Sequence, residues 1–84
     1  MTLIEVMDEA IKVRADFTGG VVTPLLFKRD GQTLRVEKVH ARWEDREQEF
    51  KRYFFSVEAG GNVYEMHLDA GTMGWRLDRV CLAG

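Results

Sequence analysis

The chain has 84 residues, enough for one domain, and 45% of them are hydrophobic while 31% are charged, which is the composition of an ordinary globular protein. The formal net charge is -2 with both signs mixed along the chain, which gives no whole-molecule attraction to nucleic acid or to an anionic membrane. The single cysteine, Cys81, excludes an internal disulfide, and no apolar run approaches the roughly 18 residues that span a bilayer.

The first ten residues predict a short helix or an extended arm ahead of the first strand. Apolar residues recur at helical spacing between Leu3 and Ile11, and Thr2 with Glu5 has the form of a capping box. Acidic residues interrupt this apolar stretch and no basic segment precedes it, unlike in a secretory signal. We therefore expect a cytoplasmic protein.

Strand signals follow this segment. Apolar and charged residues alternate over residues 11–17 until a glycine pair breaks the run, which predicts the first strand. Residues 21–28 predict a second strand, in which Pro24 lacks an amide donor and so favours a sheet edge or a bulge. The pair Asp30-Gly31 then has the composition of a tight hairpin turn.

A third strand is expected over residues 33–43, but its apolar residues change face along the way. Leu34 and Val36 share one parity, whereas the apolar residues over 39–43 have the other. A change of face inside one strand needs an extra residue. We therefore expect a β-bulge near residues 37–38, a device that bends a sheet toward closure.

The last three strands are expected over residues 51–59, 62–69 and 75–82, after a charged loop over residues 44–49. Gly60 and Gly61 separate the first two of these strands and match a two-residue hairpin turn, which fixes their register. The core pairs counted from this turn are Val57 with Tyr64, Phe55 with Met66, and Tyr53 with Leu68. The outer pairs are Ser56 with Glu65, Phe54 with His67, and Arg52 with Asp69.

Six short strands joined by tight turns predict a mostly β protein with a single domain over residues 1–84. Residues 1–10 are the arm or helix, and residues 11–82 form an antiparallel meander. A sheet this long in so short a chain is expected to be strongly curved or to form an open barrel. The alternative is a flatter sheet whose second face is covered by the helix or by a dimer partner. In either case Trp43 and Trp75 fall at inward positions of an aromatic core.

One row of the outer face combines an aromatic ring with imidazole and guanidinium groups. The parity count places His40, Phe54, His67 and Arg76 in this outer aromatic row. It also turns Arg42 outward, into the neighbouring row that contains Arg52. Such a face can stack a planar ligand or seat a partner's side chain. The opposing interpretation is that the N-terminal segment covers Phe54, which would remove this surface. The full candidate face consists of Phe54, His40, His67, Arg42, Arg52, Lys38 and Arg76.

No residue pattern in the chain predicts catalysis, a metal site or a cofactor. His40 and His67 are expected about 9–10 Å apart, two strand spacings, which is too far to share one ion. Cys81 lies between apolar neighbours and is expected to pack as a small hydrophobic residue. The acidic residues of the 44–49 loop are solvated, and the glycines form no phosphate-binding motif. We therefore expect a protein that is not an enzyme.

Five short strand-and-turn motifs follow one another along the chain: Phe27-Lys28-Arg29-Asp30-Gly31, Val36-Glu37-Lys38-Val39 with Trp43, Tyr53-Phe54-Phe55-Ser56-Val57, Val63-Tyr64-Glu65-Met66, and Gly74-Trp75-Arg76-Leu77-Asp78-Arg79-Val80. Their order resembles that of an uncharacterised bacterial family of small β domains. Some members of that family accompany or are joined to relatives of the translesion DNA polymerases, so the resemblance implies a DNA-repair accessory role. This chain departs from those members because it is acidic overall and has no polymerase part.

Protein contacts are the function that the sequence favours. We expect a non-enzymatic β domain that self-associates or docks to a larger bacterial protein, because the predicted sheet has free edges and an outer aromatic residue. The alternative is weak binding of single-stranded nucleic acid by the candidate face. We expect no interaction with a membrane.

Overall fold

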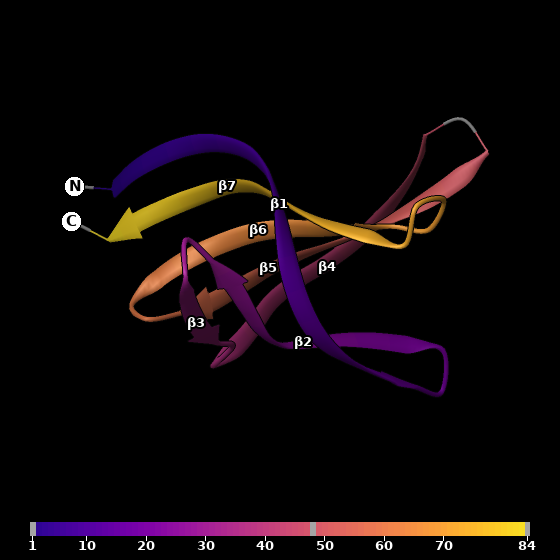
Figure 1. Ribbon diagram of the computed structural model, residues 1–84, viewed down its shortest axis with the longest axis horizontal. Helices are drawn as coiled ribbons and strands as arrows, with labels where there is room; N and C mark the ends of the chain where they lie inside the picture. Colours follow the sequence, from indigo (N-terminus) through magenta and orange to yellow (C-terminus); the bar gives the residue numbers. More distant parts are fainter. Residues whose placement is uncertain (1, 48, 84) are drawn as a thin grey trace.

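The structure is a computed structural model that describes residues 2–47 and 49–83, and these residues form seven β-strands (Figure 1). The strands are β1 (Thr2–Thr18), β2 (Val21–Arg29), β3 (Gln32–Arg35), β4 (Lys38–Glu47), β5 (Phe50–Ala59), β6 (Asn62–Asp69) and β7 (Gly74–Ala83). The part of the chain that is described has no helix that could cross a membrane.

All seven strands belong to one antiparallel sheet in the order β3-β2-β1-β7-β6-β5-β4. Strands β4 to β7 form one meander and β1 to β3 form another. The two meanders are joined where β1 pairs with β7, in a register that runs from Thr2 opposite Ala83 to Ile11 opposite Trp75. Figure 1 shows β1 arching across the molecule, and the sheet curls into a half-barrel.

The strongly curved antiparallel sheet is therefore confirmed, but the short N-terminal helix is wrong. Strand β1 begins at Thr2, and its first half pairs with β7. The apolar residues Leu3, Met7 and Ile11 are four residues apart, a spacing that fits one face of a strand as well as one face of a helix. Hydrogen bonding to β7 decides between the two, because tertiary pairing outweighs a weak local propensity.

The expected third strand over residues 33–43 is two strands at opposite edges of the sheet, which brings the number of strands to seven. The chain leaves β3 after Arg35 and enters β4 at Lys38. The Val36 amide donates to the Leu25 carbonyl at 2.9 Å, and the Glu37 amide donates to the Glu58 carbonyl at 2.8 Å. The change of face near residues 37–38 is thus a crossing between the two sheet edges and not a bulge.

The charged loop expected over residues 44–49 is also wrong, because β4 continues to Glu47 and β5 begins at Phe50. Cross-strand ion pairs support this extension, with Lys51 Nζ 3.3 Å from Glu44 Oε1. In Figure 1 the β4–β5 hairpin projects beyond the rest of the sheet. Both of its faces meet solvent there, so a strand in this position shows no apolar alternation in its sequence.

The hairpin between β5 and β6 has the register that the sequence predicts. Ala59 pairs with Asn62, and all six cross-strand pairs counted from the turn are present. Gly60 and Gly61 have φ values of 55° and 83°, the left-handed conformation that a type I′ turn requires at both central positions. Pro24 lies where β2 bulges against β1, as its missing amide favours, because Ala15 pairs with Pro24 but Arg14 pairs with Leu26.

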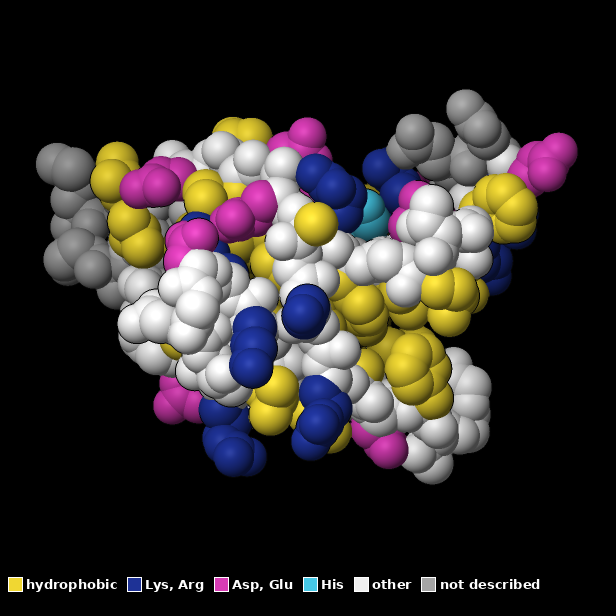
Figure 2. All heavy atoms as spheres, in the orientation of Figure 1, with side chains coloured by type: hydrophobic (Ala, Val, Ile, Leu, Met, Phe, Trp, Pro, Cys, Tyr) yellow, Lys and Arg dark blue, Asp and Glu magenta, His cyan; other side chains and the backbone are white. Residues whose placement is uncertain are grey.

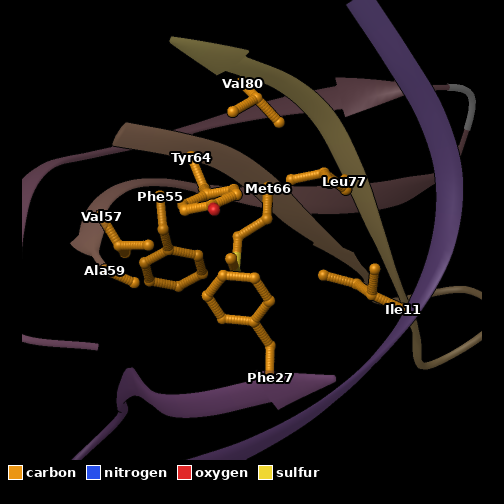
Figure 3. Packing of buried hydrophobic residues seen from close by; sticks show 9 residues of the cluster. All are labelled: Ile11, Phe27, Phe55, Val57, Ala59, Tyr64, Met66, Leu77 and Val80. Atoms are coloured by element: carbon orange, nitrogen blue, oxygen red, sulfur yellow. The ribbon is translucent and has the colours of Figure 1, made fainter. Parts of the chain in front are cut away.

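The core lies on the concave face of the half-barrel (Figure 3). Its buried members are Ile11, Phe27, Phe55, Val57, Ala59, Tyr64, Met66, Leu77 and Val80. Phe27 and Tyr64 meet edge to face with ring centres 5.0 Å apart, which ties β2 to β6 across the interior. The expected inward direction of Trp75 is confirmed, since it packs against this core and lies 5.6 Å from Phe55 between ring centres.

Candidate functional site

Phe54 lies on the outer face of β5 and is enclosed by side chains of its own sheet. Trp43 of β4 stacks on it, with ring centres 5.4 Å apart and ring planes 7° apart. His67 of β6 lies 5.0 Å away between ring centres, and Arg52 Cζ lies 5.1 Å from the Phe54 ring centre. Phe54 is therefore half-buried without help from the N-terminal segment, which pairs with β7.

A β-bulge at His40 changes the composition of the outer aromatic row. The pairing of β4 with β5 shifts between Val39 and Ala41, so His40 is the extra residue. Every side chain beyond a bulge changes face. Trp43 accordingly lies outside, opposite Phe54 and 42% exposed, so the expectation that it packs in the core is wrong. The outer row is Trp43, Phe54, His67 and Arg76, and the expectation that His40 belongs to it is wrong.

The same bulge turns Arg42 to the inner face, which corrects the outward direction expected for it. Arg42 lies opposite Phe55 in the β4–β5 register, and its Cζ lies 5.6 Å from the Phe55 ring centre. Its guanidinium group donates hydrogen bonds to the Val22 carbonyl and to Thr23 Oγ1. Arg42 thus bridges the open side of the half-barrel, from β4 to β2.

His67 points to the outer face as expected, but it is only 7% exposed and so is not a surface histidine. Its Nδ1 atom lies 2.9 Å from both carboxylate oxygens of Asp78. Asp78 is close because the pairing of β6 with β7 shifts between Glu65 and Met66, which gives β7 an extra residue at this point. The buried imidazole thus belongs to a hydrogen-bonded pair whose carboxylate is only half-buried.

Both guanidinium groups of the candidate face that remain outside are paired with carboxylates. Arg52 donates to both carboxylate oxygens of Asp45, at 2.8 and 2.6 Å. This hydrogen bonding holds the pKa of Asp45 below its ordinary value. Arg76 donates to the Asp8 carboxylate at 3.0 Å and to the Asp8 carbonyl at 2.9 Å. Most of the positive charge expected on this face is therefore balanced within the molecule.

The two remaining members of the candidate face lie near the start of β4. Lys38 is exposed and opposite Glu58 in the β4–β5 register, on the outer face as expected. His40 has its Nε2 atom 2.9 Å from Glu58 Oε1. The structure thus brings together Phe54, His67, Arg52 and Arg76, and it places Lys38, His40 and Arg42 elsewhere.

An apolar surface that the sequence did not predict lies at the open end of the half-barrel. Two adjoining hollows, of about 240 and 340 Å³, meet at residues 20–22 and Tyr53. We call them together the apolar cleft. Its lining consists of Phe17, Gly20, Val21, Val22, Arg42, Trp43, Glu44, Tyr53, Phe54, Phe55, Leu68, Ala70 and Met73. Figure 2 shows hydrophobic side chains gathered at the corresponding right-hand end, where the surface is hollowed.

The rim of the apolar cleft exposes four large apolar side chains. Phe17, Val21, Trp43 and Met73 are each between 42% and 64% exposed. They come from three parts of the chain that are distant in sequence: the β1–β2 hairpin, β4 and the β6–β7 turn. The alternation of apolar and polar residues in β1 is a sequence signal for this surface, but it does not reveal that the β1–β2 hairpin meets β4 and the β6–β7 turn.

The described residues include no group of three or more His, Cys, Asp or Glu side chains arranged to hold a metal. Cys81 is a free, half-buried thiol opposite Ile4 on one side and Val63 on the other. This is the apolar setting that the sequence predicts for it.

Comparisons of the chain with family models, with curated proteins and with solved structures found no match.

Proposed function

We propose that this protein is a non-enzymatic domain that acts through protein contacts, and that the apolar cleft is its contact surface. The observation that carries the proposal is the set of exposed side chains on the cleft rim: Phe17, Val21, Trp43 and Met73. Large apolar patches with aromatic residues and arginine are typical of surfaces that bind another protein. Covering one such side chain contributes about 1.5–3 kcal/mol.

A protein partner fits this surface better than a small molecule. Val21 and Trp43 line one hollow, and Phe17, Val21 and Met73 line the other, so a small ligand seated in either hollow leaves at least one of the four exposed side chains in water. A polypeptide that crosses the β1–β2 turn covers both hollows and the rim at once. The partner is either a larger protein or a second copy of this chain.

Insertion of side chains is a better binding mode here than addition of a strand. Strands β2 and β4 face each other across the open side of the half-barrel. A partner strand added to the edge of either one would lie about 4.8 Å from it and hydrogen-bond to its backbone. The edge of β2 lacks one amide donor at Pro24, and the edge of β4 ends in the charged residues Glu44, Asp45 and Arg46. Proline and charge are the features that keep a free edge from pairing. The partner therefore contributes apolar side chains.

The test is selection of binding peptides from a random library displayed on phage. We expect the enriched peptides to carry two or more large apolar side chains. We expect Val21→Lys and Met73→Lys to weaken their binding by roughly tenfold or more, because each places a charge on the apolar rim. Isothermal titration calorimetry measures the loss.

The matched control is Val6→Lys, since Val6 is 80% exposed on β1 at the other end of the sheet. This variant should bind the peptides as the wild type does. Equal loss in all three variants, or peptides without apolar residues, would contradict the proposal. Light scattering on the same variants identifies the partner: a wild-type dimer that Val21→Lys dissociates and Val6→Lys preserves points to a second copy.

A second candidate function, weak binding of single-stranded nucleic acid, is favoured by the Trp43–Phe54 stack. The exposed face of Trp43 offers a platform on which a base can stack. The carboxylate partners of Arg52 and Arg76 count against it, because phosphate contacts need free cations. We expect an oligonucleotide, if it binds here, to show salt-sensitive affinity that falls in Trp43→Ala and in Phe54→Ala. Affinity unchanged in both variants would sink this candidate.

A further inference from the structure

A second surface, on the outer face of β1, β2 and β3, gathers basic side chains. Lys12 of β1 lies directly opposite Lys28 of β2. In the next row Leu26 lies between Arg14 and Arg35. All four basic side chains are exposed. Figure 2 shows Lys and Arg side chains together below the centre of the view, over this part of the sheet.

These four cations differ from three arginines of the outer face. Arg52, Arg76 and Arg79 each lie against a carboxylate of the protein. By contrast, the side chains of the four basic residues of this surface make no hydrogen bond or ion pair with any described side chain. Like charges directly opposite each other on neighbouring strands are destabilising. The fold therefore carries a local electrostatic cost here that a bound anion would offset.

We propose that this basic surface, composed of Lys12, Arg14, Lys28 and Arg35, binds an acidic segment of a protein partner. It is separate from the apolar cleft, so the proposal goes beyond the proposed function and does not depend on it. The four cations form two rows, Lys12 with Lys28 and Arg14 with Arg35. A short segment with two or three carboxylates can pair with cations of both rows. Arginine and lysine pairs of this kind bind carboxylates through charge-assisted hydrogen bonds.

Two features favour an acidic protein segment over nucleic acid. The patch contains no aromatic side chain on which a base could stack, and its one apolar member is Leu26. The basic surface is also short. Exposed carboxylates bound it at both ends, with Asp16 beyond one end and Asp30 at the turn beyond the other. A long polyanion that crossed the patch would meet these carboxylates on a chain of net charge -2, whereas a short acidic segment would not.

The experiment measures binding of a fluorescent polyglutamate peptide by anisotropy at low and at physiological ionic strength. We expect saturable binding that weakens with salt. The double variant Lys12→Gln/Lys28→Gln should weaken it roughly three- to tenfold, because it removes two surface charge pairs. The matched control is Arg76→Gln/Arg79→Gln, which removes the same charge from paired positions and should bind the peptide nearly as the wild type does.

Each alternative outcome overturns the proposal. Equal weakening in both double variants would show that only net charge matters. Tighter binding of a deoxythymidine oligonucleotide of equal charge, lost in Lys12→Gln/Lys28→Gln, would assign the surface to nucleic acid. The thermal midpoint provides a second check, since relief of the Lys12–Lys28 repulsion should leave it unchanged or raise it. A clearly lower midpoint would show that the two lysines stabilise the fold and do not repel.

Discussion

At the scale of single residues, the direction of a side chain is predictable only between one irregularity of the sheet and the next. The glycine turn fixed every pair between β5 and β6, because a two-residue hairpin leaves one register. The bulge at His40 then reversed Arg42 and Trp43. A bulge of this kind has no obligatory residue type, so the sequence does not reveal it. The outer aromatic row was therefore predicted in part, with His40 in the place of Trp43.

The turn itself provides a residue-scale prediction. Both glycines have positive φ, and a Cβ at Gly61 would have no neighbour within 4 Å, so only backbone strain opposes substitution there. Gly61→Val should destabilise the protein by about 1–2 kcal/mol, whereas Gly60→Asn should stay within about 1 kcal/mol of the wild type, because Asn tolerates this conformation. Urea unfolding measures both. Equal losses in the two variants would argue against a type I′ turn.

The Arg52–Asp45 pair gives a prediction about pH. Hydrogen bonds from Arg52 lower the pKa of Asp45 from its ordinary value of 3.8. Any stability that this ion pair contributes is present above the ordinary pKa and is lost as the pH falls through the lowered one. In Arg52→Gln the pKa of Asp45 should rise toward its ordinary value, as measured by NMR titration of the side-chain carboxyl carbon. No change would show that the bidentate contact is not maintained in solution.

At the scale of elements, β1 was the hardest strand to predict because it serves two partners. Its first half pairs with β7 and its second half with β2, so its apolar residues do not follow one simple alternation. A period of four residues also suits either a helix or a strand. The split between β3 and β4 was missed for a related reason. A chain that crosses from one sheet edge to the other changes face as a bulged strand does, and only the tertiary structure separates the two.

Strand β1 should show a sharp contrast between its two halves. Ile11 is 9% exposed and belongs to the core, whereas Ile4 is 57% exposed. Ile11→Ala should cost about 2–5 kcal/mol of the free energy of unfolding, and Ile4→Ala less than about 1 kcal/mol, because only the first substitution empties core volume. Chemical denaturation measures the two values. A larger loss for Ile4→Ala would place the N-terminal half of β1 against the core instead of at the surface.

At the scale of the whole molecule, the curled sheet was predictable and its contact surfaces were not. Short strands, tight turns and an efficient apolar face in 84 residues favour a closed or strongly curved sheet. The apolar cleft instead forms at the open side of the curled sheet, between β2 and β4. The side chain of Arg42 spans the remaining opening, and the rim residues come from the β1–β2 hairpin, β4 and the β6–β7 turn. No local sequence pattern encodes such a meeting point.

The apolar cleft gathers large apolar side chains that the fold leaves exposed to solvent. The basic surface lies apart from it, on β1 to β3. Together the two proposals assign this domain one apolar and one charged region for contact with a partner. Apolar contacts of this kind dominate binding energy, while charge complementarity mainly sets orientation and association rate.

Whether the apolar cleft is the contact surface is tested most directly by ¹H–¹⁵N NMR chemical-shift mapping, in which an apolar peptide selected on the protein is titrated. We predict that the largest shifts fall on the backbone amides of Phe17, Val21, Val22 and Met73 and on the Trp43 indole. Shifts spread evenly over the sheet, or confined to the Leu3–Val6 and Cys81 region at the other end, would contradict the assignment of the apolar cleft as the contact surface.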